Sequence, residues 1–557
     1  MGTWYGLPSL YNSDEPFNVV NALAYGARQS LEPTYFVYPA FYSYILLAVY
    51  GLFFIVGRIS GVFASALDFG AAYFIDPTGL FWVGRLLSVV LGVGAVWCVF
   101  KTGERFFSRR TGLLAAGALT FSFAHADVCH WILPEAAVTL MCALALHLIL
   151  RFAQAPSTRA NLLAGLVCGL AISTKYNAGF IALPFLLAGF QPYARERVQL
   201  VKHLALGLLS LLAGFLLGSP YWLLSFSSYW QDLQYSFSHV GAGMVGHIRS
   251  VPLVWPLFEL VASDWGVGLL FVAGFFFVFF QRQKQEMVLL SFVLPTLLFV
   301  GLWSRSGVHY LAPLFPALAL LAAVFIEQIL RRIPNRAVQA TLLLSLFLPP
   351  GVKIAVQDIR LAQTDTRTLA KEWIESNLAL ESMIAYENYV YGPNLYDPAR
   401  FITHSAESQL LPLALKERLL EESLRRKTFR LVNLRKHLKL KVLAEADSTV
   451  SSRENAYVRQ LLETRLPRLS ALKRAGVPYI VASSDNYDRY FKSRPPEKGT
   501  ALWLSYKNGR RFYDSLFKSK EVQLLKEFRP TFWRPGPTIR IYQFKSYVDD
   551  NGSQKHG

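Results

Sequence analysis

The sequence predicts a polytopic α-helical membrane protein that ends in a water-soluble α/β domain. Hydrophobic residues make up 53% of the 557 positions and charged residues only 17%, against about a quarter in a soluble domain. Apolar runs approaching the roughly 20 residues needed to cross a bilayer recur up to residue 355 and are scarce after it. We therefore expect a membrane domain at residues 1–357 and an outer α/β domain at residues 358–557.

Ten membrane spans are predicted from these apolar runs. Residues 160–190 are divided into two spans at the sequence TKYNAG, because a single long helix would move the basic cluster around Arg195 across the membrane. The predicted spans lie near residues 80–100, 111–126, 133–152, 160–174, 177–190, 200–219, 262–281, 286–303, 310–330 and 337–356.

Residues 1–79 are expected to form an outer loop with interfacial helices. A single crossing by the apolar run 37–66 would place the basic sequence KTGERFFSRR on the outer side, so this run is expected to lie in the interface or to enter and return. An outer amino terminus needs a helix to carry it across the membrane. We therefore expect that the first helix of the fold is missing ahead of Met1.

Positive charges in the loops predict the orientation of the chain across the membrane. The loops facing away from the amino terminus carry about fourteen cations, namely Lys101, Arg105, Arg109, Arg110, Arg151, Arg159, Arg195, Arg197, Lys202, Arg282, Lys284, Arg331, Arg332 and Arg336. The opposite side carries only Arg28, Arg85, Lys175, Arg249 and Arg305. Because cytoplasmic loops are enriched in Lys and Arg, the amino terminus and the α/β domain are expected outside.

Two functional classes are disfavoured by composition. The net charge of +19 is spread over short loops without a nucleic-acid-binding motif, so membrane orientation explains it better than nucleic acid. The four cysteines lie in or beside apolar runs without zinc spacing, which predicts buried side chains rather than a disulfide framework. They are Cys98, Cys129, Cys142 and Cys168.

Polar and ionisable residues gather at the outer ends of the predicted spans. Ionisable residues near a bilayer are energetically costly, so such a collection on one side predicts a functional site. The collection comprises Asp14, Glu15, His125, Asp127, His130, Glu135, Lys175, Tyr176, Arg305, His309 and Tyr310.

Most of these residues also have a structural interpretation. Glu135 follows Pro134 at a predicted helix start, where a carboxylate stabilises the positive end of the helix dipole. His130 could bond to the backbone, and Lys175 could extend its ammonium group to the interface. The acidic pair before Pro16 could form a plain turn, and the Arg305, His309 and Tyr310 group could be an ordinary interfacial anchor.

Carboxylates opposite cations at a membrane surface suit group transfer from a lipid phosphate to an acceptor. A carboxylate can take the proton of the attacking hydroxyl or amine, and cations can neutralise the departing phosphate. A lipid transporter or flippase is the alternative, but it would place ionisable residues near the bilayer midplane and repeat its halves. Only Lys175 and Asp264 are candidates for such midplane charges. A noncatalytic scaffold would not need this collection.

Five sequence motifs carry a resemblance to a known family. In order along the chain they are YNSDEP, GRLLSVVLGVGAVWCVFKTGERFFSRRTGLLAAGAL, HWILPE, GLAISTKYNAGF and HYLAPLFPALALLAA. Over about residues 8–355 the chain resembles the GT-C fold glycosyltransferases of the protein O-mannosyltransferase and aminoarabinose transferase superfamily. The order of the motifs and their shared membrane side carry this resemblance.

The resemblance implies a polyprenyl-phosphate-linked sugar as donor and inversion at the anomeric carbon by single displacement. It implies Asp14 as the catalytic base, with Glu15 as its neighbour and Glu135 as a second acidic site. The implied phosphate-binding residues are Lys175, Arg305, His309 and Tyr310, and the further substrate-site candidates are His130, Asp127 and Tyr176. A lipid, glycan or protein of the bacterial cell envelope is the implied acceptor, with the protein in the inner membrane.

Two points of the resemblance stay open. Many relatives have Arg directly before the motif tyrosine, where this chain has His309, so either Arg305 supplies the positive charge or the site responds to pH. No cofactor is required by the expected chemistry, although some relatives use a divalent metal. The candidate ligands for such an ion are Asp14, Glu15, His130 and Glu135.

The carboxy-terminal domain is predicted from local patterns. DTRTLAKEWIESNL has the periodicity of an amphipathic helix, and SMIAYENYV that of a strand. VPYIVASSDNYDRYF is expected to form a buried strand and a turn, TIRIYQF a closing strand, and residues 410–475 a helix-rich basic segment. We expect this domain to select the acceptor or to act as a lid, without a catalytic role.

Overall fold

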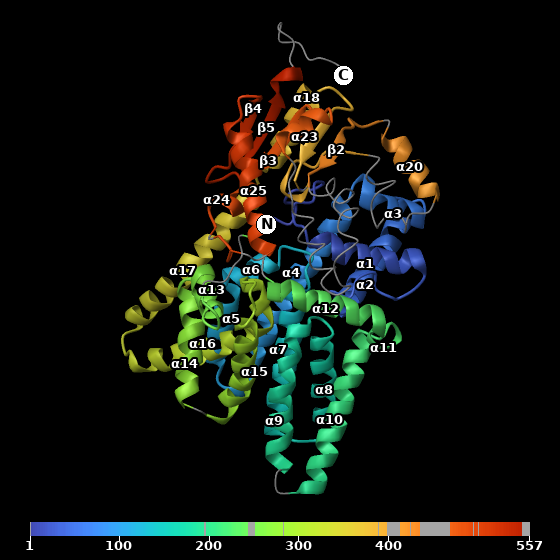
Figure 1. The fold of residues 1–557 in the computed structure, drawn as a ribbon. Coiled ribbons are helices and arrows are strands. Elements are labelled where there is room, and N and C mark those ends of the chain that lie inside the picture. Colours follow the sequence, from blue (N-terminus) through green and yellow to red (C-terminus); the bar gives the residue numbers. More distant parts are fainter. Residues whose placement is uncertain are drawn as a thin grey trace.

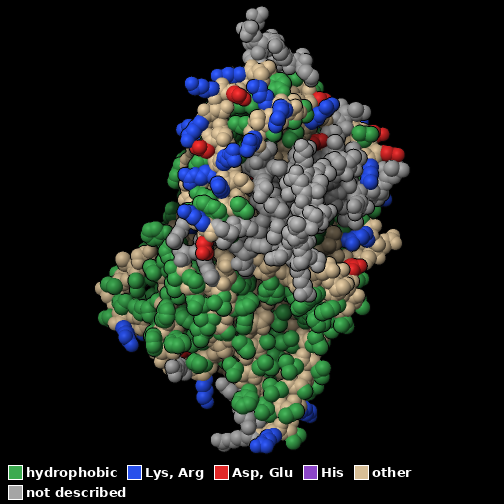
Figure 2. Space-filling model, in the orientation of Figure 1, with side chains coloured by type: hydrophobic (Ala, Val, Ile, Leu, Met, Phe, Trp, Pro, Cys, Tyr) green, Lys and Arg blue, Asp and Glu red, His purple; other side chains and the backbone are tan. Residues whose placement is uncertain are grey.

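The computed structural model describes residues 2–193, 196–242, 245, 251–281, 283–387, 389–397, 413–423, 425–434, 468–493, 495–498 and 501–547. A bundle of helices carries a smaller α/β domain at one end (Figure 1). Figure 2 shows a broad area of hydrophobic side chains on the visible face of the bundle, with Lys and Arg side chains below it and over the α/β domain. The predicted class, a polytopic helical membrane protein with a carboxy-terminal α/β domain, is confirmed.

The long helices of the described residues account for the predicted spans. Seven are long and apolar enough to cross a membrane: α2 (Phe41–Ile59), α4 (Thr78–Phe106), α7 (Pro134–Gln154), α10 (Arg197–Gly218), α15 (Lys284–Gly301), the stretch of η2 (Val308–Leu314) with α16 (Phe315–Arg332), and the one that starts with α17 (Arg336–Leu361). Shorter helices complete the bundle, namely α5 (Arg109–Thr120), α8 (Thr158–Ile172), α9 (Ala182–Tyr193) and α14 (Gly266–Gln281). Each of the ten predicted spans overlaps a helix in these two sets.

Residues 1–79 lie beside the end of the bundle that faces the α/β domain (Figure 1). They contain α1 (Glu15–Arg28), α2 and α3 (Ala66–Ile75). Helix α2 packs against α1 and α4 and has the length of a span, so the interfacial position predicted for residues 37–66 remains a prediction. On the same side, α6 (Phe123–Val128), α11 (Tyr221–Leu224), α12 (Phe226–Ala242) and α13 (Trp255–Asp264) connect the spans.

The predicted break at TKYNAG is confirmed. Helix α8 ends at Ile172, and the 3-10 helix η1 (Tyr176–Ile181) intervenes before α9 begins. The Ser157 hydroxyl starts α8 by accepting a hydrogen bond from the Ala160 amide at 3.2 Å. The chain thus reverses direction at Lys175, and α8, α9 and α10 stand side by side. The cation Arg195, on which this prediction depended, lies outside the described residues, as do Arg249 and Arg282.

The α/β domain is built on a five-stranded mixed sheet. Its strands are β1 (Met383–Tyr386), β2 (Arg430–Asn433), β3 (Tyr479–Ser483), β4 (Val522–Phe528) and β5 (Ile539–Phe544), in the order β2-β1-β3-β5-β4. β1 is parallel to both of its neighbours, whereas β5 is antiparallel to both of its own. The described helices around it are α18 (Thr366–Asn377), α20 (Leu413–Ser423), α23 (Leu469–Arg474), α24 (Ser484–Phe491) and α25 (Ala501–Lys518).

Most local predictions for this domain are confirmed. The amphipathic helix is α18, and the three expected strands are β1, β3 and β5. The turn expected after β3 is wrong, because the chain enters α24 there, with Asp485 in the helix's first turn beside the free amides. Most of residues 410–475 lies outside the described residues.

Glycines allow α8 and α10 to approach closely, and this contact can be tested. A Cβ atom at Gly169 would lie 2.0 Å from the Leu211 carbonyl oxygen. This clash could be relieved only by moving the backbone of α8 or α10, because the Leu211 oxygen is a backbone atom. We expect Gly169→Ala to destabilise the protein by about 1–3 kcal/mol, measured by thermal unfolding in detergent. The matched control is Gly51→Ala in α2, where a Cβ atom meets nothing within 4 Å. An equal effect of both substitutions would contradict the packing.

Candidate active site

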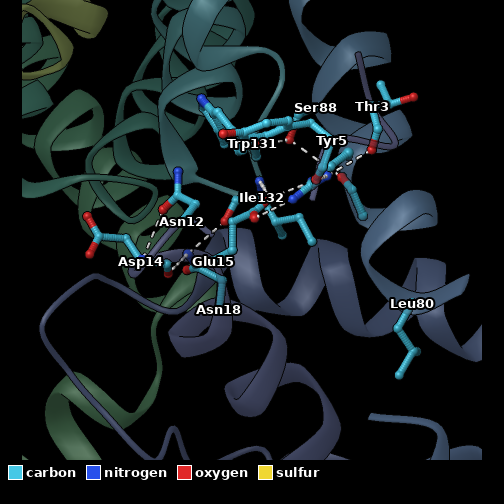
Figure 3. A network of polar contacts seen from close by, with 12 residues as sticks. Thr3, Tyr5, Asn12, Asp14, Glu15, Asn18, Leu80, Ser88, Trp131 and Ile132 are labelled. Carbon is cyan, nitrogen blue, oxygen red and sulfur yellow. Dashed lines mark hydrogen bonds and ion pairs between the residues drawn. The ribbon is translucent and has the colours of Figure 1, made fainter. Parts of the chain in front are cut away.

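A buried ion pair fixes the segment ahead of α1. Arg85 donates from Nε to Glu15 Oε1 and from Nη2 to Glu15 Oε2, each at 2.8 Å, and both side chains are fully buried. Arg85 Nη1 donates to the carbonyl oxygens of Thr3 at 2.9 Å and Tyr5 at 2.8 Å. The Ile132 amide also donates to Glu15 Oε1, at 3.0 Å. The pair thus joins residues 3–15 to α4 and to the segment before α7 (Figure 3).

These contacts correct the prediction of a catalytic role for Glu15. Both of its carboxylate oxygens are occupied by Arg85, and the side chain has no exposed surface. Arg85 is likewise a buried residue of α4 and not a loop cation. A single Arg within the apolar run GRLLSVV was the signal for this pair, because such a charge requires a partner in the protein.

Asp14 differs from its neighbour in being exposed to solvent. It precedes α1 and accepts a hydrogen bond from the Ser13 hydroxyl at 3.0 Å, while its own amide donates to Asn12 Oδ1 at 3.0 Å. Figure 3 shows the Asp14 carboxylate pointing away from the cluster around Glu15. The structure therefore holds the backbone of Asp14 in place and leaves its carboxylate accessible to a substrate.

Glu135 and Lys175 form a second buried ion pair. Lys175 Nζ donates to Glu135 Oε1 at 2.6 Å, and both side chains are more than nine-tenths buried. As predicted, α7 begins at Pro134, with Glu135 in its first turn, whereas Lys175 immediately precedes η1. Among the described residues, the second oxygen of Glu135, Oε2, has no hydrogen-bond partner. It is thus a buried acceptor that a ligand could satisfy.

Backbone contacts bring η2 to the same place. The Asn177 side chain donates to the Tyr310 carbonyl oxygen at 2.7 Å, and Thr139 Oγ1 donates to the Ala312 carbonyl oxygen at 3.1 Å. The Lys175 ammonium lies 5.8 Å from the centre of the Tyr310 ring, which is close enough for a cation–π contact. The start of α7, the segment at η1 and the segment at η2 are distant in sequence, and they meet around the Glu135–Lys175 pair.

Tyr38, in the loop between α1 and α2, links Asp14 to this group. Burial raises the pKa of Tyr38 well above its usual value, and the charges of Glu135 and Asp14 raise it further. The charge of Arg305 opposes them. Since these three charged groups act on one hydroxyl, they face a common region. The His309 ring contacts the neighbouring Tyr310 ring in a tilted arrangement, with ring centres 4.1 Å apart.

The remaining candidates, Tyr176, His130 and Asp127, have contacts of their own. Tyr176 donates its hydroxyl to the Phe36 carbonyl oxygen at 3.0 Å. His130 is bound through Nε2 to Asp358 of α17 at 2.7 Å and through Nδ1 to the Ala126 carbonyl oxygen at 2.8 Å. Burial raises the pKa of Asp127, and the charges of His130 and Lys353 oppose it. His130 thus links the end of α6 to α17, and the role of His130 and Asp127 as substrate-site residues remains a prediction.

The four candidate metal ligands do not come together. Glu15 is held by Arg85, Glu135 by Lys175 and His130 by Asp358. Within the described ranges, no group of three or more His, Cys, Asp or Glu residues is arranged to hold a metal ion. As arranged, these residues do not fit a divalent metal site.

The amino-terminal segment also contacts the α/β domain. The Tyr5 hydroxyl is hydrogen bonded to Asp365, which caps α18, and it accepts a hydrogen bond from Arg367 Nη2 at 2.9 Å. The guanidinium of Arg367 lies 3.8 Å from the centre of the Tyr11 ring. Tyr11 is in turn hydrogen bonded to Thr368 at 2.7 Å. The segment that leads to Asp14 thus lies between the bundle and the outer domain.

Comparison with known proteins places this geometry in context. The dolichyl-phosphate-mannose-protein mannosyltransferase family matches residues 72–223. An undecaprenyl phosphate-alpha-4-amino-4-deoxy-L-arabinose arabinosyl transferase from Pectobacterium carotovorum is 25% identical over 309 residues. The predicted resemblance to the GT-C glycosyltransferases is confirmed. The match to the arabinosyl transferase covers 51% of this chain and 55% of that relative, so the chain spans about half the relative's length.

Solved structures of other proteins are also similar to the chain. ArnT from Cupriavidus metallidurans in the apo state has a TM-score of 0.48 at 13% identity, over 97% of this chain and 95% of that one. The oligosaccharyltransferase of Archaeoglobus fulgidus in the apo form has a TM-score of 0.48 at 11% identity, over 98% and 86% of the two chains.

The Arg85–Glu15 pair predicts a large effect on stability. Arg85→Ala leaves the Glu15 carboxylate buried without a partner, so we expect a loss of about 3–5 kcal/mol in unfolding free energy. Thermal unfolding of the detergent-solubilised protein measures it. The matched control is Lys492→Ala, which breaks an exposed pair with Asp488 and should cost at most about 1 kcal/mol. Comparable losses in both variants would contradict the anchoring role of Arg85.

Proposed function

We propose that the protein is a membrane glycosyltransferase that takes a sugar from a polyprenyl-phosphate-linked donor. The acceptor is a hydroxyl or amine of a cell-envelope lipid, glycan or protein on the outer face of a bacterial inner membrane. The observation that carries the proposal is the grouping of accessible Asp14 with the Glu135–Lys175 pair and Arg305 around one region. The donor class is supported by the similarity to a transferase whose name includes undecaprenyl phosphate.

In the proposed reaction, Asp14 acts as general base. It takes the proton of the acceptor hydroxyl or amine while the acceptor atom forms a bond to the anomeric carbon. The bond from that carbon to the phosphate oxygen breaks, and its electron pair leaves with the lipid phosphate. A single displacement of this kind inverts the configuration at the anomeric carbon.

The cations have distinct proposed roles. Because Lys175 already neutralises Glu135, it contributes less net charge to a phosphate than the sequence prediction assumed. We therefore assign stabilisation of the leaving phosphate chiefly to Arg305, with His309 and Tyr310 beside it. The unpartnered Glu135 Oε2 is assigned to a donor hydroxyl or amine of the sugar, which would satisfy this buried acceptor.

The α/β domain is assigned to acceptor selection. Its helix α18 touches Tyr5 and Tyr11, which lie only a few residues before Asp14. An acceptor bound between the α/β domain and the bundle would therefore meet the proposed base directly. The outer location of this surface rests on the distribution of loop cations.

A transporter or flippase is less consistent with the buried charges. Asp264, a candidate midplane charge, accepts hydrogen bonds from Ser122 Oγ at 2.8 Å and from the Ala124 amide at 3.0 Å. It thus joins the end of α13 to the start of α6. Lys175, the other candidate, lies at the loop between α8 and α9.

Asp14→Asn tests the proposal. Removing the base should lower transfer from a labelled polyprenyl-phosphate sugar by about 10²- to 10⁴-fold, because general-base catalysis contributes that much. The assay uses the purified full-length chain with envelope lipid extract as acceptor. The matched control is Asp76→Asn, which removes an exposed carboxylate from the same amino-terminal segment and keeps an oxygen acceptor for the Thr78 amide, so it should retain transfer.

Two outcomes would overturn this account. Full transfer by the Asp14→Asn protein would exclude Asp14 as the base. Translocation of the labelled lipid across proteoliposomes, without sugar transfer under any acceptor condition, would instead favour the flippase.

A further inference from the structure

A basic pocket lies at the end of the bundle opposite Asp14. It has a volume of about 700 Å³ and opens between the last turns of α4 and α7. Its lining consists of Lys101, Glu104, Arg105, Phe106, His147 and Arg151.

The pocket is separate from the candidate active site. Glu135 lies in the first turn of α7 and Arg151 in the last, 16 residues further along. At 1.5 Å per residue, the helix places them roughly 24 Å apart along its axis. A ligand in this pocket would therefore not contact Asp14 or the Glu135–Lys175 pair.

Positive charge dominates the lining. Lys101 Nζ is paired with Glu104 Oε2 at 2.8 Å, which balances one cation against the single carboxylate. Arg105 and Arg151 are exposed and have no ion-pair partner among the described residues. Two guanidinium groups on neighbouring helices are thus free to bind an anion, and their planar donors suit phosphate oxygens.

The walls of the pocket are ordered by contacts between the two helices. Thr102 Oγ1 is hydrogen bonded to His147 Nδ1 at 3.1 Å, and Phe106 packs edge-on against the His147 ring at 5.3 Å between ring centres. These contacts fix α4 against α7 directly beneath the two arginines. The pocket is therefore a built cleft between helices, not a gap between loose side chains.

Aromatic residues place the pocket at the edge of the membrane. Trp97 is 61% exposed on α4, one turn before Lys101, and the Lys101 ammonium lies 5.1 Å from its ring centre. The same ammonium lies 5.2 Å from the Phe100 ring centre. Exposed Trp is typical of the membrane–water interface, the depth at which phospholipid phosphates lie.

We propose that this pocket binds the phosphodiester headgroup of an anionic phospholipid such as phosphatidylglycerol. Arg105 and Arg151 contact the phosphate oxygens, and the acyl chains lie against Trp97 and the apolar surface of α4. Basic pockets between membrane helices are known to hold anionic headgroups in this way. The bound lipid would hold the α4–α7 contact on the side of the membrane away from the α/β domain.

Native mass spectrometry of the detergent-solubilised full chain tests this site. We expect a first phosphatidylglycerol molecule to bind at least 10-fold more tightly than phosphatidylcholine. The double variant Arg105→Gln/Arg151→Gln should lose this preference by at least 10-fold. The matched control is Arg109→Gln/Arg110→Gln, which removes two exposed charges at the start of α5, outside the pocket, and should keep the preference.

Three results would overturn the proposal. Equal affinity for the two lipids would show that the pocket does not recognise a charged headgroup. Equal losses in both double variants would show a general effect of charge. Inorganic phosphate that displaces phosphatidylglycerol at equal concentration would identify a free anion as the ligand, since the acyl chains would then contribute nothing.

Discussion

The buried pair of Arg85 and Glu15 is the constraint on which the outer half of the structure depends. Removing two charges from water is costly, and the pair is tolerated only because its hydrogen-bonding groups are satisfied. Nε and Nη2 of Arg85 donate to the Glu15 carboxylate. Its third nitrogen, Nη1, donates to two backbone carbonyl oxygens. A segment of turns and loop ahead of α1 is thereby fixed to a membrane helix, so the position of Asp14, which directly precedes Glu15, is also fixed.

The same segment connects the bundle to the α/β domain. Tyr5 contributes its carbonyl oxygen to Arg85 and its hydroxyl to Asp365 and Arg367. A movement of α18 would therefore displace Tyr5 and, through Arg85 and Glu15, change the position of Asp14. This arrangement gives a physical route by which acceptor binding to the outer domain could influence the proposed base.

Hydropathy and loop charge predicted ten segments that all overlap helices, because the membrane imposes length and composition on each helix separately. They did not predict α2 as a span, although it is long and apolar enough to be one. Local signals also located the break before Tyr176 and the start of α7 at Pro134. The partners within the site could not be predicted in this way. Glu15 with Arg85, Glu135 with Lys175, and His130 with Asp358 are separated by 40 to 228 residues, so only tertiary packing brings them together.

The most direct test of the central claim is a double-mutant cycle between Arg85 and Asp14, measured as kcat/KM for sugar transfer. Arg85→Lys keeps the positive charge but loses the paired donors, so it should shift Asp14 and lower transfer. If Arg85 acts through the position of Asp14, the substitution should have little further effect in the Asp14→Asn background. Equal fold-losses in both backgrounds would contradict the account, because Arg85 would then act independently of the base.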